Sequence, residues 1–281
     1  MSPAAAPVAI VTDSTSDIPT EQATALGITV VPALVTLGGR TFPDGQGLAR
    51  SEFYRGMTGR RELPTTAAPS PLAFETAYRS LLAGGAGSVV SIHVASQLSA
   101  IYSIARQAGA SFAGKVLAVD SGQVSLGLGY QVVEAAEVAA AGADLRTVIT
   151  VADGIRRRVR LVAMLNTLEF VRRSGRVSWL RAGASDILHV KLLANVEGGK
   201  VERLALVRTV QRALDQLVGL VPTWGPLRRL AVLHTAALPE AERLARRLSD
   251  QTGLTPWVVE ATTVIGAHIG PGALGISAML L

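Results

Sequence analysis

The N-terminal half of the chain alternates short apolar runs with longer amphipathic stretches. Three runs have the length of a strand and lead into loops rich in hydroxyl groups, at 7–12, 88–94 and 115–121. The stretches 72–85 and 96–112 space apolar residues three or four positions apart, which predicts helices with one buried face. Strands and helices alternating in this way are typical of a parallel sheet covered on both faces. We therefore predict a doubly wound α/β domain.

The pattern changes after a predicted helix at 146–158. The apolar runs become shorter, and Gly198-Gly199 predicts the turn of a hairpin within 186–207. The remaining expected elements are a helix at 209–220, a strand at 227–235, a helix at 237–253 and a strand at 256–264. We predict two domains, 1–158 with a mostly parallel sheet and 159–281 with a mixed or antiparallel sheet, so that the fold class is α/β.

The composition excludes several classes of protein. With 281 residues, 49% of them hydrophobic, the chain is long enough to bury a sizeable core. No apolar run approaches the roughly 20 residues of a membrane span, and the start lacks the basic region of a signal peptide. We expect a cytoplasmic protein without a stable membrane span, while transient membrane contact stays open. The absence of cysteine excludes disulfides, thiolate metal sites and cysteine nucleophiles.

The formal net charge of +6 is carried mostly by arginine, with clusters at 156–160 and 172–176. Such a surface attracts anions, which include phosphate, nucleic acid and acidic proteins. Only 4% of the residues are aromatic, and no run interleaves basic with aromatic side chains, so we expect no nucleic-acid partner. A bias of the whole sequence toward arginine, alanine and leucine is the alternative explanation of the charge.

Motifs of common catalytic sites are absent or incomplete. The stretch 109–116 has the spacing of a phosphate-binding loop, but Val116 replaces the required hydroxyl and the stretch ends a helix instead of opening one. The sequence contains neither a dinucleotide-binding glycine pattern nor a serine elbow. Asp13 stands where an aspartyl nucleophile would, but Thr15 replaces the second aspartate, so a capping role is favoured. The histidines are too dispersed for a local zinc site: His93, His189, His234 and His268.

The loops after the predicted strands carry hydroxyl groups and few charges. Ligands of a doubly wound sheet bind at the carboxyl ends of its strands, where these loops meet. Thr66, in PTTAAPSP, and Ser96, in HVASQLS, each precede a predicted helix whose N-terminus favours a carboxylate or phosphate. Both are candidate anion ligands, with capping of a helix or loop as the alternative.

A series of motifs runs in order along almost the whole chain. They are VAIVTDSTSDIP (8–19), GITVVPALV (27–35), PTTAAPSP (64–71), SQLSAIY (96–102), VDSGQVSLGLG (119–129), SGRVS (174–178) and HIGPGALGI (268–276). Together they resemble the DegV family, which includes the fatty-acid-binding (FakB-type) subunits of bacterial fatty acid kinase. The opening and closing motifs in combination make the resemblance specific.

The resemblance implies a two-domain protein that holds one long-chain fatty acid between its domains and presents it to a kinase subunit. That partner, which would bind ATP and magnesium, converts the carboxylate to an acyl phosphate. The carboxylate ligands of the family fall on Thr66, Ser96 and His268, and Gly270 and Gly272 would shape the backbone beside the histidine. The chain alone is expected to catalyse no reaction and to bind no metal.

Three arginines in and before the SGRVS motif are candidates for docking an acidic kinase surface or for reaching the phosphates of ATP: Arg172, Arg173 and Arg176. A solvated face is the alternative. An independent small-molecule kinase or hydrolase is the second functional hypothesis, and a nucleic-acid-binding regulator, suggested only by the charge, is the third.

The loops that carry the head-group ligands depart from the family pattern by losing polar side chains. The substituted positions are Ala67, Ala95, Ala100 and Ile101. We expect weaker head-group binding or a different preferred acid. The length, unsaturation and branching of that acid, the protonation of His268 and the oligomeric state do not follow from the sequence.

Overall fold

The computed structural model describes residues 6–57, 63–177 and 190–281. Contacts divide the chain into two compact units, unit 1 with Met1–Leu34 and Ala67–Arg158, and unit 2 with Val35–Thr66 and Val159–Leu281. The segment 35–66, here called the excursion, forms a separate sheet, and its Asp44 binds Thr263 in the other segment of unit 2.

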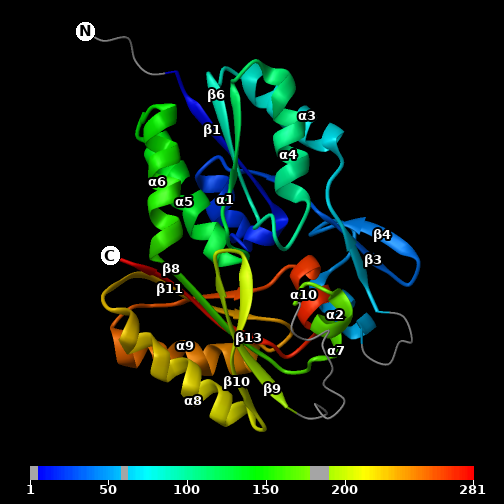
Figure 1. Ribbon diagram of the computed structural model, residues 1–281, viewed down its shortest axis with the longest axis vertical. Helices are drawn as coiled ribbons and strands as arrows, with labels where there is room; N and C mark the ends of the chain where they lie inside the picture. Colours follow the sequence, from blue (N-terminus) through cyan, green and yellow to red (C-terminus); the bar gives the residue numbers. More distant parts are fainter. Residues whose placement is uncertain (1–5, 58–62, 178–189) are drawn as a thin grey trace. The chain divides into compact units, whose positions relative to one another are not determined.

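Unit 1 is built on a four-stranded parallel sheet in the order β2-β1-β6-β7. The strands are β1 (Val8–Asp13), β2 (Thr29–Val31), β6 (Ser88–His93) and β7 (Val116–Asp120). Figure 1 shows α3 (Pro71–Ala83) and α4 (Ile101–Gly109) on one side of the sheet and α5 (Leu126–Ala140) and α6 (Leu145–Arg158) on the other. Short helices follow β1, namely η1 (Ser14–Ser16) and α1 (Thr20–Ala25), and η2 (Ala110–Phe112) follows α4. The predicted doubly wound arrangement is confirmed.

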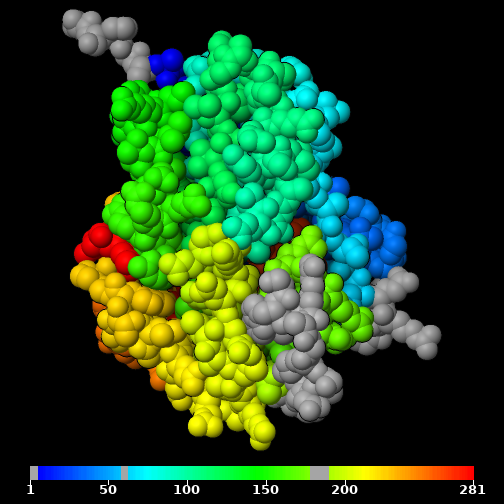
Figure 2. Space-filling view, viewed as in Figure 1, coloured from blue at the N-terminus to red at the C-terminus, as the bar shows by residue number. Residues whose placement is uncertain are grey.

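The local sequence explains how the helices of unit 1 begin and which face they bury. Ser70 accepts a hydrogen bond from the backbone of Ala73, and proline occupies the first position of α3. Phe74 and Tyr78, one turn apart, are fully buried. Helix α5 is buried along its first three turns because the sheet covers one face and α6 another, whereas α4 and α6 form much of the surface visible in Figure 2.

Unit 2 contains a six-stranded sheet in the order β10-β9-β8-β13-β11-β12. The strands are β8 (Val159–Leu165), β9 (Lys191–Glu197), β10 (Lys200–Val207), β11 (Leu227–His234), β12 (Trp257–Glu260) and β13 (Leu274–Leu280). All neighbours are antiparallel except β11 and β12, which are parallel. The predicted mixed sheet and the hairpin at Gly198-Gly199 are confirmed.

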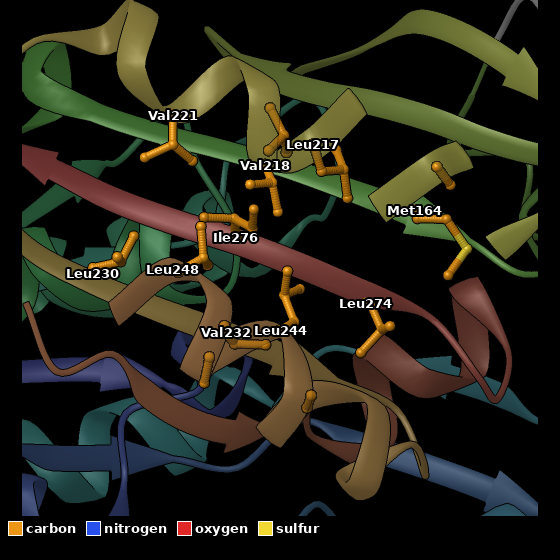
Figure 3. Packing of buried hydrophobic residues seen from close by; sticks show 14 of the residues in the cluster. Met164, Leu217, Val218, Val221, Leu230, Val232, Leu244, Leu248, Leu274 and Ile276 are labelled. Atoms are coloured by element: carbon orange, nitrogen blue, oxygen red, sulfur yellow. The ribbon is translucent and has the colours of Figure 1, made fainter. Parts of the chain in front are cut away.

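Two helices cover one face of this sheet and close its main core. Helices α8 (Val210–Leu220) and α9 (Leu238–Thr252) pack their apolar sides against the central strands, and η4 (Val221–Trp224) extends α8. Figure 3 shows side chains of these helices beside those of the strands: Met164, Leu217, Val218, Val221, Leu230, Val232, Leu244, Leu248, Leu274 and Ile276. No helix of the described residues has the length and apolar content needed to cross a membrane.

The excursion and two short helices make up the rest of unit 2. The excursion forms β3 (Leu34–Leu37) and β4 (Arg40–Pro43), then α2 (Arg50–Met57) and β5 (Thr65–Ala67), with the strands in the order β4-β3-β5. Helix α10 (Thr263–Ile269) contacts both α2 and α7 (Glu169–Ser174). The strand predicted at 256–264 is too long. Strand β12 ends at Glu260, and residues 263 and 264 belong to α10.

Candidate functional site

A threonine of the excursion reaches the histidine of α10. Thr66 lies in β5, and its Oγ1 is 2.9 Å from Nε2 of His268, near the C-terminal end of α10. The two residues are 202 positions apart along the chain, both belong to unit 2, and both are partly buried. The structure thus brings together two of the three predicted carboxylate ligands.

The imidazole of His268 is neutral near pH 7. Burial lowers its pKa to about 4, and the positive charge of Arg176 adds to the shift. A neutral imidazole has one N–H and one acceptor nitrogen, so Nε2 either accepts the hydroxyl proton of Thr66 or donates to its oxygen. Each of the two side chains can therefore donate a hydrogen bond to an anionic ligand while it remains uncharged.

The turn after α10 requires glycine at two positions. Gly270 and Gly272 have φ values of 77° and 79°. A Cβ atom would lie 2.3 Å from the ring of Phe170 in the first case and 2.7 Å from the amide of Asn166 in the second. Thr235, which follows β11, donates its hydroxyl proton to the carbonyl of Gly270 at 2.7 Å. The turn therefore fixes where α10 ends.

The excursion also holds the beginning of α10. Asp44 Oδ1 accepts hydrogen bonds from the backbone N–H of Thr263 at 3.1 Å and from its hydroxyl at 2.6 Å. The Tyr54 hydroxyl donates to the carbonyl of Ala261 at 3.2 Å, and a Cβ on Gly266 would lie 2.5 Å from that hydroxyl. Asp44 is only 6% exposed, although it lies in the loop between β4 and α2. No sequence signal identified these contacts, because their partners are more than 200 positions away.

The three candidate arginines lie on and after α7, and all are exposed. Arg173 forms an ion pair with Glu169 at 3.4 Å, one turn earlier on the helix. Arg176 donates from Nη1 to the carbonyl of Ser174 at 2.7 Å. Only Arg176 among the three affects the pKa of His268. The last residue of the SGRVS motif, at 178, lies outside the described residues, as does His189.

The third predicted ligand, Ser96, belongs to unit 1 and lies in the turn after β6, with an exposed side chain. Its backbone N–H donates to Oδ1 of Asp120 at 3.2 Å. The preceding residue, Ala95, donates its N–H to the carbonyl of Gln123 at 2.9 Å. The backbone of this turn is therefore held from the end of β7, while the serine side chain faces solvent.

Asp13 has the capping role that the sequence favoured. Its Oδ1 accepts the N–H of Thr15 at 3.0 Å, at the start of η1. Its Oδ2 lies 3.0 Å from Nδ1 of His93, whose Nε2 lies 2.6 Å from Oγ of Ser91. This order of groups is that of a serine hydrolase triad, but all three side chains are fully buried, so no substrate reaches the serine.

The described residues contain no group of histidine, aspartate and glutamate able to hold a metal ion.

Fold and site together define a two-unit α/β protein with a neutral histidine and a threonine paired beside a glycine turn. The DegV family model matches residues 7–280, so the chain belongs to the DegV family. DegV domain-containing proteins of Streptomyces coelicolor and Deinococcus radiodurans are 36% and 35% identical to it, over 96% of this chain and 97% of each relative.

Solved structures of the family share the fold over nearly the whole chain. A fatty-acid-binding DegV family protein from Thermus thermophilus is 30% identical, with a TM-score of 0.89, over 98% of this chain and 100% of that one. DegV, a fatty acid binding protein from Bacillus subtilis, is 28% identical, also with a TM-score of 0.89, over 99% and 100%.

Proposed function

We propose that this protein binds one long-chain fatty acid and that Thr66 and His268 hold the carboxylate. The observation that carries the proposal is the 2.9 Å contact between these two side chains, which both belong to family motifs. The family members of known structure from Thermus thermophilus and Bacillus subtilis bind fatty acids, which supports the same ligand class here. Ser96, the remaining hydroxyl of the family pattern, is proposed as a third ligand.

The tail of the acid supplies most of the affinity. Burying about 15 methylenes at roughly 0.8 kcal/mol each contributes about 12 kcal/mol before the costs of association and of ordering the chain. The head group then needs only enough hydrogen bonds to offset the loss of water from the carboxylate. Neutral donors from a hydroxyl and an imidazole meet this need.

The neutral site also suits a carboxylate that must react later. A guanidinium paired with the carboxylate would reduce its nucleophilicity, whereas Thr66 and neutral His268 position it by hydrogen bonds alone. We propose that the bound acid is presented to a separate kinase subunit carrying ATP and magnesium. A carboxylate oxygen then attacks the γ-phosphorus, the acyl phosphate forms, and ADP leaves.

The exposed arginines provide a docking surface for that kinase. Arg172, Arg173 and Arg176 lie within five residues of each other on and after α7. Their charge complements an acidic partner surface. The protein alone is proposed to have no kinase or hydrolase activity, so turnover of ATP or of an ester by the purified chain would favour the alternative of an independent enzyme.

The test is mass spectrometry of lipids extracted from the purified, folded protein. We expect one fatty acid per chain. A protein that is empty and takes up no added long-chain acid would contradict the proposal.

Variants of the two ligands separate binding from presentation. Thr66→Ala and His268→Ala should reduce retention of the acid by about tenfold or less, which is the effect of one lost hydrogen bond. Acyl phosphate formed with the kinase, trapped by hydroxylamine, should fall much further because the carboxylate is no longer oriented. Thr65→Ala, an exposed neighbour in β5, is the matched control. Equal losses of retention and formation would argue against the orienting role.

A further inference from the structure

The four-stranded sheet of unit 1 has a switch point where ligands of doubly wound folds usually bind. The order β2-β1-β6-β7 places β2 on one side of β1 and β6 on the other, so the winding reverses between β1 and β6. Ligands, often anions, bind beyond the carboxyl ends of the two strands at such a point. Here Asp13 ends β1 and His93 ends β6, and both side chains are fully buried.

The carboxylate of Asp13 receives four hydrogen bonds at this point. Oδ1 accepts from the backbone N–H and the hydroxyl of Thr15, at 3.0 and 2.5 Å. Oδ2 accepts from Nδ1 of His93 at 3.0 Å and from the backbone N–H of Val94 at 3.1 Å. Two of the donors are backbone amides in the loops after β1 and β6, the groups that hold the anion in ligand-binding members of this architecture.

A chain of buried donors leads to the same carboxylate. The Tyr78 hydroxyl lies 2.8 Å from Oγ of Ser91, and Ser91 lies 2.6 Å from Nε2 of His93. Burial raises the pKa of Tyr78 to about 12, so its hydroxyl keeps the proton and can donate it. With Nδ1 of His93 donating to Asp13 and Nε2 accepting from Ser91, the one hydroxyl proton of Ser91 is used, so Ser91 accepts from Tyr78. Every hydrogen bond in the chain then points toward Asp13.

We propose that Asp13 is a built-in anion, a side-chain carboxylate that occupies the anion site of the switch point in unit 1. Asp13 thereby takes up backbone donors that bind an external anion in other doubly wound folds. The donor set is specific for a carboxylate, because an amide in place of Asp13 would direct its NH2 group at a backbone N–H in either orientation. Removal of the carboxylate should leave a site for a small carboxylate such as formate.

The built-in anion also positions the loop that carries Ser96. Three successive backbone N–H groups of this loop have fixed acceptors: Val94 donates to Asp13, Ala95 to the carbonyl of Gln123, and Ser96 to Asp120. Asp13 supplies the first of these three and is therefore a positioning residue for Ser96. This second consequence rests on the proposed function, since it assumes that Ser96 is a head-group ligand.

The experiment is rescue of Asp13→Ala by formate. We expect sodium formate to raise the Tm of this variant by about 3 °C or more, as a ligand that binds only the folded state does. Sodium chloride at equal ionic strength and neutral formamide should not do so, and neither the wild type nor Asp13→Asn should respond to formate. Val11→Ala is the matched control, because it opens a cavity in the same buried strand without exposing donors.

The outcomes decide between a built-in anion and a merely structural aspartate. If formate and chloride affect Asp13→Ala equally, the proposal is wrong. If Asp13→Ala does not fold on its own, the yield of folded protein after dilution from denaturant is measured instead. This yield should rise with formate and not with chloride. Equal yields with the two salts would overturn the proposal. Fatty acid uptake by Asp13→Ala should recover with formate as well. A wild type that takes up no fatty acid would remove the proposed function but leave the Tm result valid.

Discussion

His93 in unit 1 and His268 in unit 2 each lie beside a hydroxyl group, yet their surroundings differ. His93 is fully buried, and both of its ring nitrogens contact side chains of its own unit, Asp13 and Ser91. His268 is partly buried, and its Nε2 meets the single hydroxyl of Thr66. Both ring nitrogens of His93 are therefore bound within the core, whereas among the described residues His268 has a side-chain partner only at Nε2.

The largest expected effect distinguishes the two histidines by stability. His93→Ala removes one partner from a buried carboxylate, which should lower the free energy of unfolding by about 3–5 kcal/mol. His268→Ala removes a partly buried ring and one hydrogen bond, which should lower it by about 1–2 kcal/mol. Urea denaturation of both variants measures the difference. Losses of similar size would remove the distinction between the two histidines.

A smaller effect concerns the dependence of stability on pH. Because the pKa of His268 is about 4 in the folded protein and about 6.5 when unfolded, the unfolded chain binds a proton first as the pH falls. Stability is therefore lost on acidification from about pH 7 toward pH 4, and this residue contributes about 2 kcal/mol of the loss by pH 5. His268→Gln should lose correspondingly less stability over the same range. Parallel pH profiles for wild type and variant would contradict the lowered pKa.

The smallest effect tests the connection between Arg176 and His268. Arg176→Glu replaces a charge that lowers the pKa of His268 with one that raises it, so the imidazole should titrate at a higher pH. NMR titration of the His268 ring protons measures this shift, with Arg172→Glu as the matched control on the same surface. The same substitution should weaken kinase-coupled acyl phosphate formation if Arg176 belongs to the docking surface; unchanged coupling would remove it from that surface.

The alternation of apolar runs and amphipathic stretches was enough to predict the parallel sheet of unit 1 and the helices that cover its two faces. Strands β1, β6 and β7 are short apolar runs, and the helices between them bury residues at helical spacing, so local pattern and final structure agree. The same reasoning failed at α10. Its sequence is short and rich in β-branched residues, and the carboxylate that binds its first turn, Asp44, is 219 positions away.

The excursion shows what the local pattern leaves undetermined. It forms the separate sheet β4-β3-β5 and helix α2, but the sequence pattern does not indicate which of the two units this segment joins. That choice depends on contacts such as those from Asp44 and Tyr54 to the residues around the start of α10. Their partners could not be identified by spacing, because long-range contacts leave no period in the sequence.

The sequence by itself determined the order of strands and helices in unit 1, the mixed character of the second sheet and the family, because these depend on local periodicity and on motifs. It also named Thr66 and His268 as candidates. Only the tertiary structure decided that these two residues meet, that His268 is neutral, and that Asp13 is enclosed by four donors. Hydrogen bonding and burial, which set these properties, arise when residues far apart in the chain fold against one another.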